Sequence, residues 1–245
     1  MTGFKSNNFV IKLAETEAEL QEIFKLRYEE LLLCYNKENT NDTGLFIDEY
    51  DRICDHLIAI DLENNVIAGT YRLVRKAHIL NIGKFITELE FDISKIKDYE
   101  ILELGRAVVR NEYRNGSVIA LLWQGIVQYV VTNNIRFMFG TASFHGVSPL
   151  EYKHALSSIY YKHLTPIKFR AKAINYTVEL KQLSLEELDL KRAKKEMPPL
   201  IKGYINLGAS FGEGGFLDYD FNSLDVFTLI DIQTVNQRYL DKFMK

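Results

Sequence analysis

Residues 103–116, ELGRAVVRNEYRNG, place the Glu103 carboxylate and three guanidinium groups along and just after an apolar stretch. Glu103 and Arg106 lie within the apolar part, whereas Arg110 and Arg114 follow it. A positioned carboxylate can take a proton from an amine, and a guanidinium can bind a carboxylate or a phosphate. A buried Glu103–Arg106 ion pair that merely holds a strand together explains the first two residues as well, and both interpretations stay open here.

The spacing of Glu103 and Arg106 does not suit a regular strand. Strict alternation would send the two side chains to opposite faces and bury one charge against the core. We therefore predict a β-bulge at Gly105, which inserts one residue and brings both side chains to the same face. Backbone groups freed around a bulge are available to a ligand.

The turn after the strand has features of an anion site. Backbone N–H groups and the positive end of a helix dipole favour a phosphate at a strand-to-helix turn. Gly116 lets the backbone come close, Ser117 is expected to cap the helix, and Arg110 and Arg114 add charge. An ordinary solvated connection with two surface arginines accounts for the same residues equally well.

The elements that position these residues alternate between strand and helix. Thr16 and Glu19 form a capping-box pattern, which predicts a helix through about Leu32. The run 101–142 reads as a strand (101–109), a turn, a buried helix (117–132) and a second strand (135–142), a βαβ unit. The other predicted elements are strands at 9–14 and 224–232, a hairpin over 56–74 turning at 63–65, and helices at 149–164 and 184–199. We find no linker or repeat and expect one α/β domain over residues 1–245.

Composition narrows the classes of function. The chain has 245 residues, 47% of them hydrophobic, and a net charge of −3, which argues against broad nucleic-acid binding. Cys34 and Cys54 are too few for a disulfide framework or a four-cysteine metal site, and the histidines have no metal-ligand spacing. We see neither a secretory signal nor a membrane span, and expect a cytoplasmic protein.

Several motifs, taken in order, resemble the Gcn5-related N-acyltransferase (GNAT) superfamily. The resemblance is to the branch that takes long acyl chains from acyl carrier protein, which includes ornithine-lipid N-acyltransferases, N-acyl amino acid synthases and acyl-homoserine-lactone synthases. The C-terminal motifs resemble the ornithine-lipid type in particular. The motifs are IFKLRYEELL (23–32), FIDEYDRICDHLIAID (46–61), AGTYRL (68–73), ELGRAVVRNEYR (103–114), LLWQGIVQYVVTNNIRFMFGTASF (121–144), PPLIKGYINLGA (198–209) and LDYDFNSLDVFTLI (217–230).

This resemblance implies a fold, a reaction and a site. The fold would be a GNAT-like mixed central sheet flanked by helices. The reaction would move a long, 3-hydroxylated fatty acyl group from the phosphopantetheine of acyl carrier protein to the amine of ornithine or glycine, with no permanently bound cofactor and no metal. Glu103 would be the base, and Arg106 would fix Glu103 and the strand. The expected acceptor-binding residues are Arg27, Asp48, Asp51 and Arg72, and the expected donor-phosphate residues are Arg110, Arg114, Gly116 and Ser117.

One departure and several alternatives accompany these expectations. The superfamily's coenzyme A turn is Arg/Gln-x-x-Gly-x-Gly/Ala, whereas Gly116 follows Arg114 by two and Val118 occupies the last small position. A carrier-protein arm has a single phosphodiester, for which a less complete cradle suffices. The acidic and basic residues around the acceptor could instead form a structural lattice. An acyl-homoserine-lactone or other N-acyl amino acid signal synthase, a non-catalytic acyl-carrier or lipid-binding module, and peripheral membrane contact at product release remain alternatives.

Overall fold

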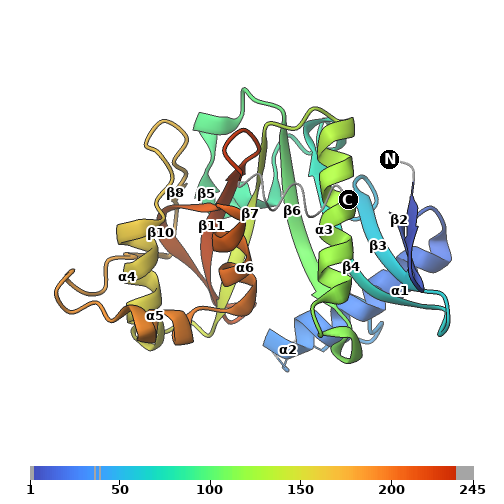
Figure 1. Cartoon of the computed structure of the whole chain (residues 1–245), viewed down its shortest axis with the longest axis horizontal. Coiled ribbons are helices and arrows are strands. Elements are labelled where there is room, and N and C mark those ends of the chain that lie inside the picture. Colours follow the sequence, from blue (N-terminus) through green and yellow to red (C-terminus); the bar gives the residue numbers. More distant parts are fainter. Residues whose placement is uncertain (1–2, 36, 39, 236–245) are drawn as a thin grey trace. The chain divides into compact units, whose positions relative to one another are not determined.

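The computed structural model describes residues 3–35, 37–38 and 40–235, which form two compact units (Figure 1). The first unit contains the described residues up to 83 together with 102–135. The second contains residues 84–101 and the described residues from 136 onward. One domain over residues 1–245 stays a prediction. The residues expected to carry the site all fall in the first unit.

An antiparallel sheet forms the centre of the first unit, with strand order β1-β2-β3-β4-β6. The hairpin predicted over 56–74 is confirmed, and Asn65 takes a positive φ of 52° in its turn. The strands are β1 (Phe4–Ser6), β2 (Phe9–Leu13), β3 (Asp55–Asp61), β4 (Val66–Arg75) and β6 (Ile101–Val109).

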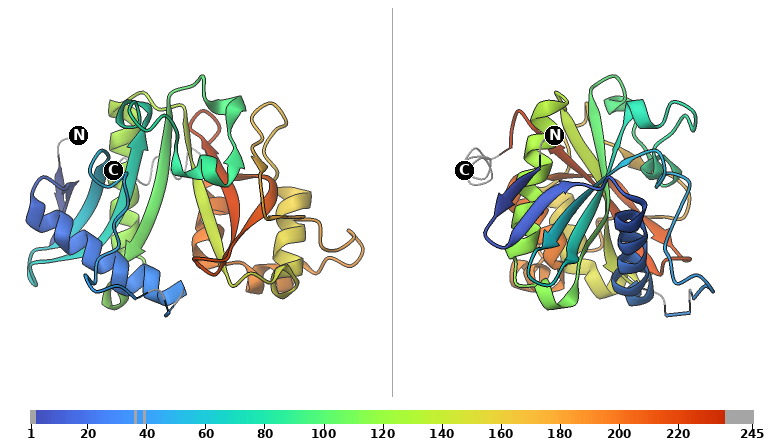
Figure 2. Two further views of the ribbon diagram at one scale, coloured as in Figure 1. Left: turned by 180° about the vertical axis from the view of Figure 1, so that it is seen from behind. Right: turned by 90° about the vertical axis from the view of Figure 1, so that its right-hand side faces the viewer.

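Two helices cover opposite faces of this sheet, as Figure 2 shows in its right-hand view. Ile58 of β3 packs with Ile23 and Phe24 of α1 (Glu17–Arg27). Its neighbour Leu57 meets Gly125 of α3 (Ser117–Thr132) from the other face. The alternation of β3 side chains therefore produces two cores, one for each helix.

The predicted start of α1 is confirmed, whereas α1 ends at Arg27, before the predicted end near Leu32. Thr16 and Glu19 form the capping box that begins α1, with the Glu19 N–H donating to Thr16 Oγ1 at 3.2 Å. A π-helical turn, Tyr28–Leu32, and the short α2 (Leu33–Tyr35) continue the chain after α1. The long helix α3 has the predicted bounds, 117–132.

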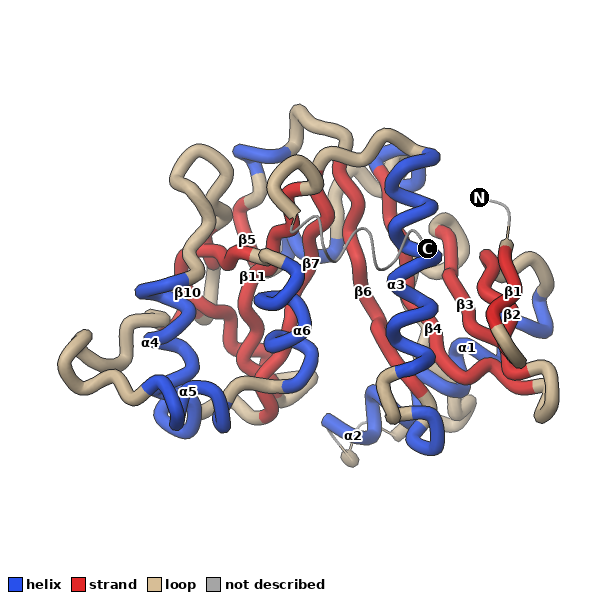
Figure 3. The backbone as a smooth tube through the Cα atoms, viewed as in Figure 1, coloured by secondary structure: helices blue, strands red, loops and turns tan. Residues whose placement is uncertain are grey.

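The second unit has a mixed sheet in which β7, β11 and β10 are antiparallel neighbours. Its helices α4 and α5 pack on each other, and α6 lies against β11 (Figure 3). Phe85, Phe91, Phe139 and Phe227 form an aromatic core. The strands are β5 (Phe91–Asp92), β7 (Phe137–His145), β8 (Lys172–Ala173), β9 (Thr177–Val178), β10 (Ser210–Asp218) and β11 (Ser223–Asp231), and the helices are α4 (Lys153–Lys162), α5 (Leu190–Glu196) and α6 (Pro199–Leu207).

The prediction of a long helix over 184–199 is wrong at both ends. Asp189 accepts hydrogen bonds from the N–H groups of Lys191 and Arg192 and starts α5 there. The proline pair 198–199 then begins a new helix, because proline suits the first helical position. The sequence reading missed this helix, α6.

The glycine-rich run 208–215, which reads as a flexible loop, is mostly the strand β10. A Cβ on Gly212 would lie 2.9 Å from Phe227 Cβ and 3.0 Å from the Ala171 carbonyl oxygen. Gly214 takes a φ of 77° where the β10–β11 register shifts. These glycines therefore serve close packing and an irregular strand. None of the helices in the described ranges is long and apolar enough to cross a membrane.

Candidate active site

The predicted bulge in β6 is present, but it lies one residue later than expected. Arg72 of β4 pairs with Gly105, and Thr70 pairs with Val108, so β6 has one extra residue between these pairs. Arg106, rather than Gly105, takes the left-handed conformation, with a φ of 51°. A non-glycine residue held there is strained, and such strain is concentrated at functional sites.

The loop before β3 brings two carboxylates against this bulge. Asp48 Oδ1 and Oδ2 both lie 2.7 Å from Arg72 Nη1. Asp48 Oδ2 also accepts a 3.0 Å hydrogen bond from Arg106 Nη2. The Arg106 guanidinium lies over the ring of Phe46, 4.2 Å from its centroid. Asp48 therefore joins the loop, β4 and β6 at one point.

Asp51 forms the buried half of the same network. Its Oδ1 accepts from Arg27 Nη1 at 2.7 Å and from Arg72 Nη1 at 3.1 Å. Its Oδ2 accepts the N–H of Asp48 at 2.9 Å, which fixes the loop. Arg27 Nη2 lies 2.9 Å from His56 Nδ1. The network thus extends from α1 to β6 through five charged side chains.

Exposure divides the network into an inner and an outer part. The Arg27 and Asp51 side chains are 0% and 1% exposed, and that of Arg72 is 4% exposed. The side chains of Arg106 and Asp48 are 23% and 24% exposed. A ligand can therefore reach the Asp48–Arg106 pair, and the other three residues hold that pair in place.

The mutual pairing keeps the network charged. Burial alone would raise the pKa of Asp48, but the guanidinium groups of Arg72 and Arg106 hold that pKa at about 2. Burial likewise opposes the charge on Asp51, and Arg27 and Arg72 lower its pKa. Burial lowers the pKa of Arg27 to about 10 despite Asp51. All five groups therefore remain ionised near neutral pH.

Glu103, the predicted base, is buried at 4% exposure on β6, opposite Val74 of β4. Burial, with the Glu103 carboxylate as the next cause, raises the pKa of Tyr50 to about 12. The guanidinium of Arg72 lies 5.9 Å from the centroid of the Tyr50 ring. Glu103 therefore belongs to the same neighbourhood as the network, on the face that carries Arg72.

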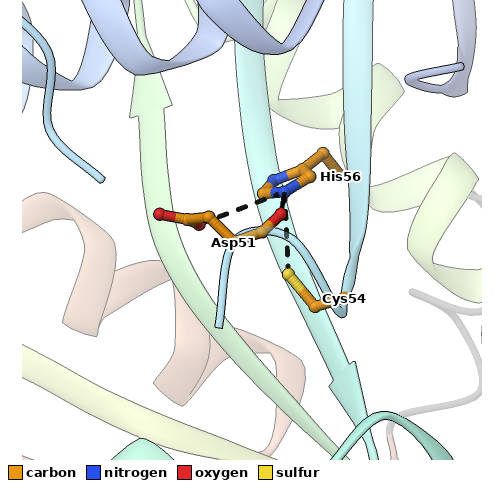
Figure 4. Close-up of side chains that lie close together, drawn as sticks. All are labelled: Asp51, Cys54 and His56. Carbon is orange, nitrogen blue, oxygen red and sulfur yellow. Dashed lines mark hydrogen bonds and ion pairs between the residues drawn. The ribbon is translucent and has the colours of Figure 1, made fainter. Parts of the chain in front are cut away.

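Asp51, Cys54 and His56 offer a cluster of metal-ligand atom types, drawn in Figure 4. His56 Nε2 lies 2.8 Å from the main-chain carbonyl oxygen of Asp51 and 3.6 Å from Cys54 Sγ. Burial raises the pKa of Cys54 to about 12, so the thiol is protonated. Because Asp51 already binds two guanidinium groups, this donor set disfavours a cation.

The predicted phosphate turn is a separate surface feature. Arg114 Nη2 donates to Glu30 at 2.7 Å, and Arg110 Nη2 lies 3.6 Å from Glu22. Gly116, with a φ of 93°, is the N-cap residue of α3. The expectation that Ser117 caps the helix is wrong, because Ser117 is the first helical residue and donates its N–H to Asn115 Oδ1 at 3.0 Å.

The structure thus brings together five of the predicted residues, with Glu103 nearby: Arg27, Asp48, Asp51, Arg72 and Arg106. Arg110 and Arg114 of the turn instead pair with Glu22 and Glu30. Sequence reasoning missed three members of the neighbourhood: Phe46, Tyr50 and His56. The signal for the first two was their place beside Asp48 and Asp51 in FIDEYD. His56 gave no signal, because its partners lie on a helix and in a loop.

Comparisons with known proteins identify the family of the chain. Residues 26–124 match the family model described as an acetyltransferase (GNAT) domain. The chain is 31% identical to an L-ornithine N(alpha)-acyltransferase of Rhodobacter capsulatus, covering 97% of this chain and 95% of that protein. It is 34% identical to the protein of the same name from Agrobacterium fabrum, covering 95% of this chain and 84% of that one.

A solved structure shares the fold. FeeM, an N-acyl amino acid synthase from uncultured soil microbes, is 9% identical, with a TM-score of 0.52 over 92% of this chain and 91% of that one. The predicted GNAT-like fold class and family resemblance are confirmed. Since relatives above 30% identity align along nearly its whole length, this chain belongs to the L-ornithine N(alpha)-acyltransferase family and is an acyltransferase.

Proposed function

We propose that this protein transfers a long 3-hydroxyacyl group from acyl carrier protein to the α-amine of ornithine, the first step in making an aminolipid. The observation that carries the proposal is the partly exposed Asp48–Arg106 pair at the edge of the buried network. An amino acid presents a carboxylate and an ammonium group a short distance apart, and this pair offers one complementary charge for each. The names of the aligned relatives supply ornithine as the first acceptor to test.

The charge of the network fits a zwitterionic acceptor. Arg27, Arg72 and Arg106 against Asp48 and Asp51 leave one positive charge in excess (three minus two). Arg106 has the most exposed side chain of the three arginines, so the acceptor carboxylate would bind there. Arg27 and Arg72, predicted to bind the acceptor, would act from behind by fixing Asp51 and Asp48. A zwitterionic acceptor adds no net charge, so the buried Glu103 carboxylate would balance the one excess positive charge of the network.

In the proposed reaction Glu103 takes a proton from the acceptor ammonium, directly or through one water. The amine lone pair then forms a bond to the thioester carbonyl carbon, and an oxyanion develops. Arg106 and Ala107 fall between the ladder pairs of β6 and β4, so their backbone N–H groups are the proposed oxyanion donors. Glu103 releases this proton to solvent and takes a second proton from the nitrogen of the tetrahedral intermediate. The C–S bond then breaks, the neutral amide forms, and the pantetheine sulfur leaves as a thiol that carries this second proton.

The donor side remains the turn before α3. Gly116 and Ser117 begin a 16-residue helix, whose N-terminus favours a phosphodiester. Arg110 and Arg114 already form ion pairs with Glu22 and Glu30. The donor phosphate would have to bind these arginines beside the two glutamates or displace them. Contact with a membrane surface would serve release of the lipidic product.

The test is mass spectrometry of the purified protein with one acyl donor and one acceptor at a time. The donors are 3-hydroxyacyl carrier protein, the unhydroxylated acyl carrier protein and the matching acyl-coenzyme A. The acceptors are ornithine, glycine, lysine and S-adenosylmethionine, and fragmentation locates the acylated nitrogen. We expect an Nα-acylornithine from the hydroxylated carrier-protein donor.

The other outcomes separate the alternatives. An acyl-homoserine lactone would make the protein a signal synthase. Product with another amino acid would keep the reaction and change the acceptor. Absence of product with every acceptor, while wild type and Glu103→Gln bind acyl carrier protein equally, would favour a non-catalytic binding module.

A further inference from the structure

Resting on the function proposed above, we propose that His56 is a positioning residue for acceptor binding, which acts as a neutral imidazole held in its Nε2–H tautomer. Its side chain is 2% exposed and lies between Arg27 of α1 and the main chain of Asp51. These two partners belong to the inner part of the network. The influence of His56 on the acceptor would pass through Asp51 and Asp48.

The two hydrogen bonds of His56 specify its tautomer. The carbonyl oxygen of Asp51 can only accept, so Nε2, 2.8 Å away, must carry the proton. Arg27 Nη2 can only donate, so Nδ1, 2.9 Å away, must be bare. A protonated imidazole would point an Nδ1–H at the guanidinium, and its positive charge would face Arg27 and Arg72.

The surroundings on every side agree with a neutral ring. The charged groups facing it are Arg27 from α1, Asp51 from the loop and Arg72 from β4, with Cys54 nearby and the edge of Phe24 packed on it. Burial and the Arg27 charge lower the pKa of His56 to about 4. The hydrogen-bond pattern of His56 therefore does not change across the pH range of ordinary enzyme assays.

A chain of contacts connects this ring to the acceptor edge. His56 fixes the Asp51 carbonyl and one side of Arg27, and Arg27 Nη1 fixes the Asp51 carboxylate. Asp51 Oδ2 then binds the Asp48 N–H, and Asp48 Oδ2 binds Arg106. Arg27 depends on His56 in particular, since Arg27 Nε is buried and has no hydrogen-bond partner among the described residues.

The activity test compares His56→Leu, which removes both hydrogen bonds, with His56→Gln, whose amide can still donate to the Asp51 carbonyl. The matched control is His78→Leu, which removes another largely buried histidine bonded to an arginine, Arg75, in the same unit. With the best acyl donor, His56→Leu should raise the KM for the acceptor about tenfold, the size of one lost hydrogen bond to a charged group. The KM for the donor should stay unchanged.

His56→Gln should recover most of the acceptor KM, and His78→Leu should lower the melting temperature without moving that KM. Equal losses of stability in the two leucine variants, with the acceptor KM of both unchanged, would overturn the positioning role. If wild type acylates no acceptor, the proposed function fails, and the tautomer is then tested by itself.

That second measurement is the imidazole ¹⁵N spectrum of the full chain, with the His56 signals assigned from their loss in His56→Gln. We expect a neutral Nε2–H pattern that stays constant from pH 5 to pH 8. A His56 that titrates within this range, or that carries its proton on Nδ1, would contradict the inference whether or not the enzyme is active.

Discussion

Glu103 carries the most specific expectation at the scale of single residues. Replacing it by glutamine keeps its size and polarity but removes its ability to accept a proton from the ammonium group. We expect kcat for the acceptor to fall roughly 10²- to 10³-fold, within the usual range for a general base. Acyl carrier protein should bind as before. Full activity of Glu103→Gln at neutral pH would assign Glu103 a structural role.

The two aspartates should respond differently to the same substitution. Asp51→Asn leaves Arg27 and Arg72 as buried guanidinium groups that share fewer counter-charges, so we expect a loss of about 3 kcal/mol or more in the free energy of unfolding. Asp48 lies at the exposed edge, so Asp48→Asn should lower the free energy of unfolding by only about 1 kcal/mol. It should raise the acceptor KM more than Asp51→Asn does. Urea denaturation and steady-state kinetics of both variants measure this contrast, and a reversed order would reject the division into inner and outer parts.

The bulge belongs to the scale of elements and can be tested by two glycines. A Cβ on Gly105 would meet nothing closer than Arg72, at 3.9 Å, and Gly105 has no positive φ. Gly105→Ala should therefore change the free energy of unfolding by less than about 1 kcal/mol. Gly125→Ala in α3 would place a Cβ 2.9 Å from Ile11 Cγ2 and should cost roughly 1–3 kcal/mol. A loss for Gly105→Ala larger than the expected value would indicate that the strained backbone of the bulge lies at Gly105 instead of Arg106.

How far the elements could be predicted depends on whether their signals are local. The capping box at Thr16 and the apolar helix 117–132 were predictable because caps and burial on most sides are written in consecutive residues. The boundaries of α4 and α5 were predicted only in part, because each region contains several possible capping and turn residues. The helix α6 was not predicted. Residues 208–215 looked mobile because glycine permits both flexibility and close packing.

At the scale of the whole molecule, acid should weaken the fold in two stages. His56 has a pKa of about 4 in the folded protein against 6.5 when unfolded, so its contribution is complete above pH 6.5 and is lost as pH falls toward 4. Asp48 follows, from about its unfolded value of 3.8 down to about 2. These shifts correspond to roughly 3 and 2 kcal/mol.

Urea midpoints measured from pH 7 down to pH 4 should therefore fall, and His56→Gln should fall less steeply. His78 and His163 also have lowered pKa values and act in the same direction, so some slope will remain. An identical slope in wild type and His56→Gln would show that His56 is not the main acid-sensitive group. The difference in slope between wild type and His56→Gln gives the contribution of His56 to the pH dependence, apart from those of His78 and His163.

The site as a whole was only partly predictable. Arg27, Asp48, Asp51 and Arg72 were found together through a family resemblance, whereas their division into buried supports and an exposed pair required the fold. Alternation along β6 predicted a bulge, because one charge would otherwise face the core, but could not say which residue carries the strain. His56 remained outside the predicted site because its two partners are 29 and 5 residues away and follow no period.

The gradient of exposure among the three clustered arginines has a chemical consequence. Reagents that condense with guanidinium groups, such as 1,2-dicarbonyls, need access to both terminal nitrogens. Arg106 offers a part of its side chain to solvent, whereas Arg27 and Arg72 are enclosed by the fold. Within this cluster the folded protein should therefore form its adduct at Arg106, and an amino acid occupying the site should shield it. Peptide mapping of the labelled protein, with and without ornithine, would measure the amount of adduct at Arg106. A smaller amount with ornithine would report binding of the acceptor, and no acyl donor is needed.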